Sequence, residues 1–97
     1  MKALYLLVGS KFRSPTEQKV FKSIRKGDHV ALVREPTNKF DSNAVKAMVG
    51  NNHVAYVIAS DARILAGIMD SEHHTEVNGS AAFMGAGIYV EVEHAES

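Results

Sequence analysis

Short stretches of apolar residues separated by polar turns run along most of the chain, which predicts a protein built mainly of β-strands. Residues 3–9 are apolar almost throughout, as expected for a strand covered on both faces. Val30, Leu32 and Val33 mark a second strand, His29–Arg34. Further strands are expected at Ala44–Val49, His53–Ile58, 74–83 and 87–94.

A helical pattern follows the strand that ends near residue 58. Its apolar positions fall at i, i+3, i+4 and i+7, and either Ser60 or Asp61 can cap it. The apolar stripe comprises Ala62, Leu65, Ala66 and Met69, widened by Ile64 and Ile68. A shorter helical turn is expected within the polar segment 10–27, with Val20, Phe21 and Ile24 on its apolar side. The pattern is a meander of five or six strands with one or two helices, which favours a small barrel or sandwich.

The length of 97 residues fits one domain, residues 1–97. With no cysteine, neither a disulfide framework nor a thiolate zinc site is possible. The apolar run near Met1 is followed by Lys11 and Arg13 where a signal peptide would have a small-residue cleavage site, so it is better explained as the first strand. No stretch approaches the roughly 20 apolar residues that cross a bilayer. We expect a cytoplasmic protein with no membrane partner.

Charge is unevenly distributed although the formal net charge is zero. Residues 1–46 contain ten of the eleven Lys and Arg and four acids, a net charge of +6. Residues 47–97 contain Arg63 and seven acids, a net charge of −6. Two interpretations stay open: a basic face that attracts phosphates, or halves of the sequence that mix in space.

Catalytic and metal-binding patterns are not recognisable. His73 and His74 are adjacent, so in a strand they would point to opposite faces, and the other histidines lack ligand spacing. The glycines between 79 and 87 lie between strands, as hairpin glycines do, and not before a helix where a phosphate loop would need them. No nucleophile or carboxylate pair has an evident partner. We therefore expect no enzyme activity, no cofactor and no metal.

Two aromatic residues stand among polar and basic neighbours. Phe12 lies between Lys11 and Arg13, and Phe40 follows Asn38 and Lys39 and precedes Asp41. Bases of a single strand stack on exposed aromatic rings while Lys and Arg contact the phosphates. Composition alone leaves a second interpretation open, in which both rings turn inward as loop anchors.

The stretch around Phe40 resembles the signature of the HIRAN domain. In that family, a strand ending in an Arg-acid-Pro turn leads to an Asn-x-aromatic-Asp-x-Asn-Ala-hydrophobic run. This chain has Leu32-Val33-Arg34-Glu35-Pro36-Thr37-Asn38-Lys39-Phe40-Asp41-Ser42-Asn43-Ala44-Val45. The strand ending at Tyr56-Val57-Ile58 and the helix 60–70 are also similar to the family, and the resemblance spans about residues 5–94.

The resemblance implies a modified OB-like β-barrel. HIRAN domains occur fused to DNA translocases and nucleases and as stand-alone bacterial and phage proteins. In one member the domain grips the 3′ end of single-stranded DNA and helps to reverse replication forks. Its pocket stacks terminal bases on aromatic rings and holds the 3′-hydroxyl on an aspartate.

Carried over by position, the resemblance implies stacking roles for Phe12 and Phe40 and a hydroxyl-binding role for Asp41. Lys11 matches an arginine at the pocket, and Tyr56 takes the place of a histidine. Phe83 matches a phenylalanine of the late hairpin, and Asn38 falls in the same loop as Phe40. Lys11, Arg13 and Lys39 would contact the phosphate backbone.

The sequence also departs from the pattern. Two tyrosines are replaced by phenylalanine, which keeps the ring face and loses a hydroxyl. Lys11 lacks the bidentate fork of arginine. A lysine expected shortly after Tyr56 is absent, since Ile58 and Ala59 stand there. These changes predict weaker or less end-selective binding.

Three functional hypotheses follow. The leading one is a DNA-binding domain for a free 3′-hydroxyl end of single-stranded DNA in repair or replication, beside a helicase, translocase or nuclease. The alternative is a protein-interaction adaptor that does not touch nucleic acid. A third is a homo-oligomer formed through an exposed edge strand. For Asp41, a purely local role as a turn aspartate also stays open.

Overall fold

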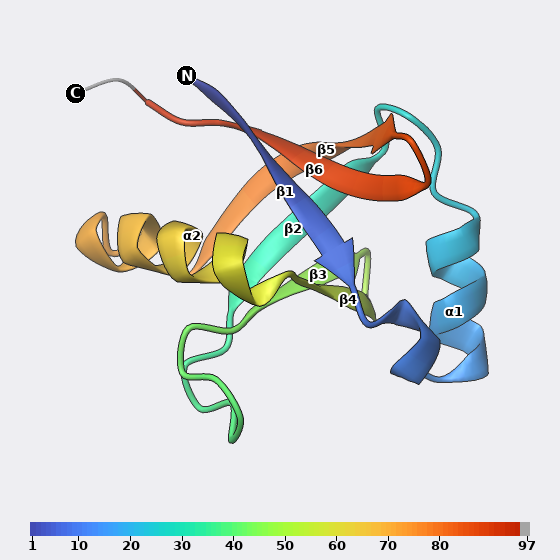
Figure 1. Ribbon diagram of the computed structural model, residues 1–97, viewed down its shortest axis with the longest axis horizontal. Coiled ribbons are helices and arrows are strands. Elements are labelled where there is room, and N and C mark those ends of the chain that lie inside the picture. The colour runs from blue at the N-terminus through green and yellow to red at the C-terminus, as the bar shows by residue number, and fades with distance from the viewer. Residues whose placement is uncertain (96–97) are drawn as a thin grey trace.

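The computed structural model describes residues 1–95, and in that range six antiparallel strands close into a barrel with the order β1-β4-β3-β2-β5-β6 (Figure 1). The strands are β1 Lys2–Val8, β2 His29–Arg34, β3 Val45–Val49, β4 Asn52–Val57, β5 Glu76–Met84 and β6 Gly87–Glu93. The helices are the short 3₁₀ helix η1 Ser10–Phe12 and the α-helices α1 Pro15–Lys22 and α2 Ala59–Ser71. The predicted mainly-β barrel with one or two helices is confirmed.

The position of β1 makes the topology more than a meander. Only β2–β3–β4 and β5–β6 pair in sequence order, whereas β1 lies between β4 and β6 and closes the barrel. Covering of β1 on both faces was a wrong prediction. Tyr5 and Leu7 are buried, but Leu4 and Val8 on the outer face are 39% and 37% exposed. The outer face of β1 is therefore partly in contact with water.

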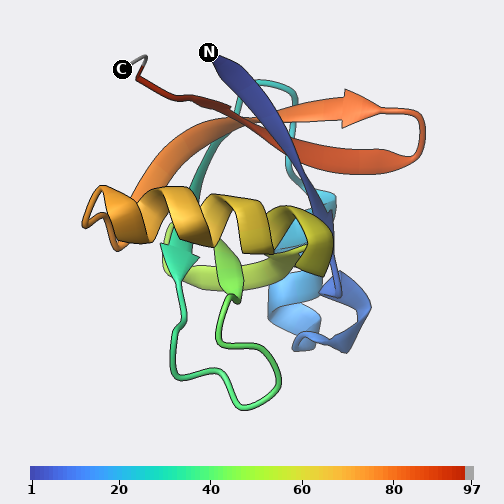
Figure 2. The ribbon, with the colours of Figure 1, turned by 60° about the vertical axis from the view of Figure 1, so that its left-hand side comes forward.

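Helix α2 supplies one side of the core. Its four predicted stripe residues are all fully buried: Ala62, Leu65, Ala66 and Met69. They pack with the inward side chains of the strands, and burial of a Leu or Met side chain contributes about 1.5–3 kcal/mol. Ile64 does not widen the stripe, because it faces solvent and is 61% exposed. Figure 2 shows α2 crossing the barrel above the loop that joins β2 to β3.

The start of α2 also differs from the prediction. The helix begins at Ala59 after Ile58, and no side chain caps it. The Asp61 carboxylate instead accepts a hydrogen bond from the Leu6 backbone N–H at 3.1 Å, which ties the first turn of α2 to β1. Within residues 1–95, no helix has the length and apolar character needed to span a bilayer.

Helix α1 forms where the sequence predicts only a short helical turn. Ser14 and Glu17 make a capping box, in which the Ser14 hydroxyl accepts from the Glu17 N–H and the Glu17 carboxylate accepts from the Ser14 N–H. Pro15 at the first position presets the helical φ angle. Val20 and Phe21 then pack against the barrel core, and Ile24 is buried just past the helix.

The last two strands meet at close range. A Cβ atom at Gly79 of β5 would lie 2.5 Å from the Glu91 carbonyl oxygen and 2.6 Å from Val90 Cγ1. Only glycine therefore allows β5 to pass this close to β6. His73 and His74 lie between α2 and β5, so His74 falls outside β5 although it was predicted within the strand 74–83, and His73 adopts a left-handed conformation with φ 58°.

Candidate functional site

The connection between β2 and β3, residues 35–44, is organised by the side chain of Asn38. Its Oδ1 accepts hydrogen bonds from the backbone N–H groups of Phe40 at 2.9 Å and Asp41 at 3.0 Å. Its Nδ2 donates to Glu35 Oε1 at 2.7 Å. One amide group thus holds both ends of the turn, as Asn residues do in Asx motifs.

Glu35 and Tyr56 extend this network from the loop to the barrel wall. The Tyr56 hydroxyl, on β4, donates to the same Glu35 oxygen at 2.8 Å. The hydrogen bonds from Asn38 and Tyr56 lower the pKa of Glu35 and so favour its charged form. Partial burial, together with the Glu35 carboxylate, raises the pKa of Tyr56, which remains a neutral hydrogen-bond donor.

Arg34 fastens the loop to α2 from the opposite side. Its guanidinium pairs with Asp70 in a bidentate geometry, at 3.0 and 3.1 Å. Its Nη1 donates to the carbonyl oxygens of Ser42 at 3.0 Å and Ala44 at 3.1 Å. The Arg34 side chain is only 8% exposed, whereas that of Asp70 is 58% exposed. The loop is therefore anchored by a largely desolvated guanidinium and not by its own backbone alone.

The anchored loop borders a hollow of about 240 Å³. Its walls come from the loop, from β4 and from the start of α2: Asn38, Phe40, Asp41, Ala44, Tyr56, Val57 and Ala59. The Phe40 ring is 97% exposed, so it does not serve as an inward anchor. Asp41 is half-buried, and its Oδ1 accepts from the Asn43 N–H at 2.8 Å. The local turn role therefore exists, and it uses one of the two carboxylate oxygens.

Lys11, Phe12 and Arg13 lie on the neighbouring side of β4. Val8 of β1 pairs with Tyr56, and Gly9, with a positive φ of 81°, then turns the chain into η1. The Phe12 ring is 80% exposed, and Lys11 Nζ lies 5.2 Å from its centre, within range of a cation–π contact. Arg13 points back to the barrel, where its Nε donates to the His53 carbonyl oxygen at 3.0 Å and its Nη2 lies 3.2 Å from Glu17 Oε1.

Two further residues belong to this surface and were not assigned roles from the sequence. Lys46 of β3 pairs with Tyr56 in the strand register, and its charge helps to lower the pKa of Glu35. The His53 ring lies edge-on to Tyr56 with centroids 4.6 Å apart. Burial, followed by the nearby charges of Arg13 and Lys46, lowers the pKa of His53. The lysine that the family pattern has shortly after Tyr56 is absent, and Ile58 and Ala59 stand there instead. Lys46 nevertheless brings a cation near Tyr56 from the adjacent strand.

Phe83 lies apart from this group. It sits near the tip of the β5–β6 hairpin, paired with Ile88, and does not line the hollow. In both views the hairpin tip and the loop between β2 and β3 extend from different sides of the barrel (Figures 1 and 2). Phe83 is 46% exposed.

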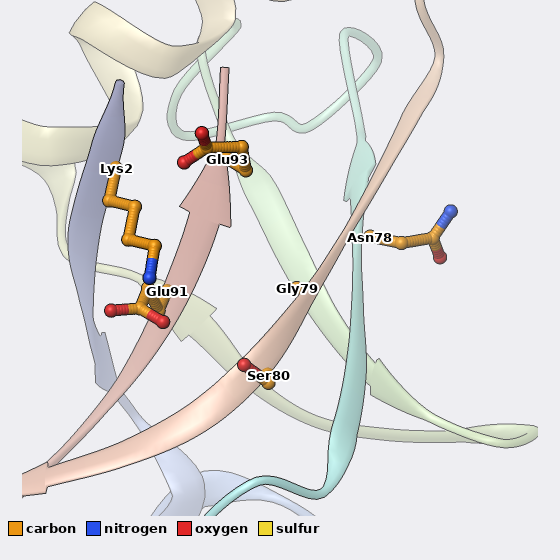
Figure 3. A pocket seen from close by; sticks show the side chains of 6 residues that line it. All are labelled: Lys2, Asn78, Gly79, Ser80, Glu91 and Glu93. Atoms are coloured by element: carbon orange, nitrogen blue, oxygen red, sulfur yellow. The ribbon is translucent and has the colours of Figure 1, made fainter. Parts of the chain in front are cut away.

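A second hollow, of about 290 Å³, has no aromatic side chain in its lining. It lies over β1, β5 and β6 and is lined by Lys2, Asn78, Gly79, Ser80, Glu91 and Glu93 (Figure 3). The Lys2 side chain extends toward Glu91, while Asn78 points away. Two carboxylates against one amine repel phosphate, so this hollow does not fit a nucleic-acid backbone.

The structure thus brings together Asn38, Phe40, Asp41 and Tyr56 in one hollow, with Lys39 exposed on the same loop. Lys11 and Phe12 lie one short turn beyond the β1 residue that pairs with Tyr56, and Arg13 contacts β4. Arg34 and Glu35 occur in the quoted motif, and their polar side chains beside a turn could have indicated a role in holding the loop. Lys46 and His53 carry no such signal, because their proximity depends on strand register.

Comparisons with known proteins agree with this arrangement. The HIRAN domain family profile matches residues 4–85. The HIRAN domain of human HLTF, known from a crystal structure, superposes with a TM-score of 0.66 and 25% identity, covering 95% of this chain and 76% of that one. A crystal structure of a protein from Lactobacillus plantarum superposes with a TM-score of 0.69 over 96% of this chain and all of that one, at 18% identity. No curated protein matches significantly.

The family match covers most of the chain, and the barrel, the loop motif and the single long helix lie where the resemblance predicts them. HIRAN domains are known for binding DNA, which supports a nucleic-acid-binding role in general terms. The chain therefore belongs to the HIRAN domain family.

Proposed function

We propose that this domain binds single-stranded DNA at a free 3′-hydroxyl end, with the terminal nucleotide in the hollow beside Phe40 and Asp41. The observation that carries the proposal is the shared hollow: an exposed aromatic ring, a half-buried carboxylate and a tyrosine line one cavity of about 240 Å³. The hydrogen bonds of Asn38, Glu35 and Arg34 hold that loop in place before any ligand arrives. A preorganised site loses less entropy when it binds.

Asp41 supplies the end selectivity in this proposal. One carboxylate oxygen accepts from the Asn43 N–H, and the second has no hydrogen-bond donor among the described residues. That second oxygen is suited to accept the hydrogen bond of a 3′-hydroxyl. A 3′-phosphate would instead place negative charge beside a partly desolvated carboxylate, which is unfavourable.

Phe40 and Phe12 supply affinity without sequence preference. Both rings are exposed: Phe40 lies beside Tyr56 in the hollow, and Phe12 lies four residues beyond Val8, the β1 residue that pairs with Tyr56. Stacking of a base on such a ring contributes about 1–3 kcal/mol whichever base it is. Lys11 lies beside the Phe12 ring, Lys39 precedes Phe40 in the sequence, and Lys46 pairs with Tyr56, so these lysines are placed to contact the phosphates. Arg13 adds a further positive charge, although it also forms a hydrogen bond to β4.

A comparison of two oligonucleotides tests the end-binding role. Fluorescence anisotropy with the same sequence carrying a 3′-hydroxyl or a 3′-phosphate should show tighter binding of the hydroxyl form. Asp41→Ala should weaken binding of the hydroxyl form by about 1–3 kcal/mol. Equal affinity of the wild type for both ends would contradict the proposal.

Asp41→Asn separates the ligand role from the turn role. Asparagine keeps an oxygen that can accept from the Asn43 N–H and removes the charge that repels phosphate. The variant should fold as the wild type does but lose the preference for the hydroxyl over the phosphate. A variant that keeps the full preference would show that Asp41 serves the loop alone.

The cellular setting is also a proposal. A domain that holds a free DNA end would act in the cytoplasm, in repair or replication, and would direct a helicase, translocase or nuclease to that end. Neither the fold nor the site requires catalysis by this domain.

A protein-interaction adaptor is the second candidate, favoured by the apolar outer face of β1, where Leu4 and Val8 are partly exposed. Salt dependence distinguishes the two roles. DNA binding must weaken steeply as salt rises, because condensed counterions are released on binding, whereas an apolar protein contact is insensitive to salt. A flat salt response of oligonucleotide binding would favour the adaptor.

A further inference from the structure

Six cations and one acid occupy the segment 10–26, which contains η1 and α1, a net charge of +5. Five of the cations are exposed: Lys11, Lys19, Lys22, Arg25 and Lys26. In the range 1–95, none of these five forms an ion pair, in contrast to Arg13 and Arg34. We call these five residues the basic track. A set of exposed, unpaired cations on one segment attracts a polyanion.

The basic track is connected rigidly to the candidate hollow. Helix α1 and η1 both contact β4, the strand that carries Tyr56. The Gln18 side chain of α1 donates to the carbonyl oxygens of Lys11 at 3.3 Å and Arg13 at 2.8 Å. Lys22 lies four residues after Gln18, one turn further along the same face of α1. Lys22 therefore lies on the side of α1 that contacts η1, and Lys19 is its neighbour three residues earlier on the helix surface.

The other charged border of the hollow is unfavourable to DNA. Helix α2 begins at Ala59, in the lining of the hollow, and leads to Asp70 and Glu72. Residues 59–76 carry four acids and one arginine, and one of the acids, Asp70, pairs with Arg34 of β2, so the net charge of this border is −2. When the end of a DNA strand is bound in the hollow, its phosphates are therefore attracted toward α1 and repelled by α2.

We propose that the basic track binds the phosphates of the nucleotides on the 5′ side of the bound end, so that the DNA leaves the hollow over η1 and runs along α1. This inference rests on the proposed function and adds the path of the strand to it. Binding should then strengthen as the oligonucleotide becomes long enough to reach α1.

The test compares a tetranucleotide with a dodecanucleotide, both with a 3′-hydroxyl, on the wild type and on the double variant Lys19→Gln/Lys22→Gln. Both lysines are exposed on α1, so the variant should keep the fold. It should bind the tetranucleotide as the wild type does and the dodecanucleotide about three- to tenfold more weakly. The slope of the logarithm of its binding constant against the logarithm of the salt concentration, here called the salt slope, should be smaller by about 1.4 for the dodecanucleotide. Each of the two lost phosphate contacts removes about 0.7 from this slope.

Two controls sharpen the result. Lys19→Arg/Lys22→Arg keeps both charges and should restore the salt slope. Lys2→Gln removes an exposed cation from the acidic hollow over β1, β5 and β6 and should change neither affinity nor slope.

The outcomes separate the two proposals. The basic track is supported if the NMR amide signals of Phe40 and Asp41 shift on addition of either oligonucleotide, while those of α1 shift only with the longer one. Equal affinity of the wild type for both lengths, or an unchanged salt slope in the double variant, overturns the track and leaves end binding intact. Absence of binding at either length overturns the proposed function and the track with it.

Discussion

The loop 35–44 and the β5–β6 hairpin both place an exposed phenylalanine at a connection between antiparallel strands, yet they differ in what surrounds the ring. Phe40 is followed by Asp41 and held by the Asn38 oxygen, beside a hollow. Phe83 stands between Ala82 and Met84 and opposite Ile88, in a hairpin that turns through Gly85 with φ 58°. The aromatic ring of the loop thus has polar neighbours, whereas the aromatic ring of the hairpin has apolar ones.

The difference shows that exposure of an aromatic ring does not by itself indicate a stacking site. A nucleotide whose base stacks also needs hydrogen-bond partners for the polar edge of that base and cations near its phosphate. The loop offers a carboxylate, an amide and nearby lysines for these contacts. At Phe83 the residues on either side, Ala82 and Met84, and the cross-strand partner, Ile88, are all apolar. Position in the barrel, and not residue type, separates the two phenylalanines.

The largest expected effect is on the stacking ring of the loop. Phe40→Ala should weaken binding of a single-stranded oligonucleotide by about 1–3 kcal/mol, because it removes one stacking ring. It should leave the free energy of unfolding unchanged, since the ring is 97% exposed. Phe83→Ala is the matched control and should leave binding unchanged. Anisotropy titrations with both variants check this, and equal losses would mean that the two rings are equivalent.

The next effect concerns the anchoring of the loop. Arg34→Ala should lower the free energy of unfolding by about 2 kcal/mol, because the largely buried guanidinium serves the Ser42 and Ala44 carbonyl oxygens as well as Asp70. Asp70→Asn changes only the exposed partner and should cost much less, because solvent screens the charge of an exposed carboxylate. Urea unfolding measures both values. A cost for Asp70→Asn as large as that for Arg34→Ala would indicate that the ion pair, and not the carbonyl contacts, anchors the loop.

The smallest effect is a pH response of the loop that the hairpin lacks. The Glu35 pKa lies below its ordinary value of 4.5, because Asn38 and Tyr56 donate hydrogen bonds to the carboxylate and Lys46 and His53 lie nearby. The stabilising contribution of Glu35 is therefore present above pH 4.5 and is lost as the pH falls through the lower, folded-state pKa.

Amide NMR signals of Phe40 and Asp41 should report this transition, with a midpoint below 4.5, while those of Phe83 and Met84 should not. In Glu35→Gln the amide keeps an oxygen acceptor and no longer titrates, so the transition should disappear. A midpoint at or above the ordinary value would show that the network does not favour the ionised carboxylate.

The amino-acid sequence alone predicted the strand segments, because short apolar runs bounded by turn residues depend only on local spacing. It likewise predicted the buried stripe from Ala62 to Met69, since residues three and four apart share a helix face whatever the fold. The Asn38–Asp41 turn is equally local, and its hydrogen bonds join residues within three positions of each other.

Other features were decided only when distant segments met. The place of β1 between β4 and β6 left Leu4 and Val8 exposed, although their apolar character suggested burial. Helix α2 begins after Ile58, whose apolar side chain cannot cap it, and the Asp61 carboxylate accepts a hydrogen bond from the distant Leu6 N–H instead.

For the candidate site, the sequence determined which rings and charges are available, and the tertiary structure decided which of them share a surface. Tyr56 joined Glu35 and Lys46 because strand pairing sets their register, and Phe83 was separated from Phe40 because the hairpin extends from another side of the barrel. Strand register and barrel closure depend on packing across the whole chain, and no local pattern of residues encodes them.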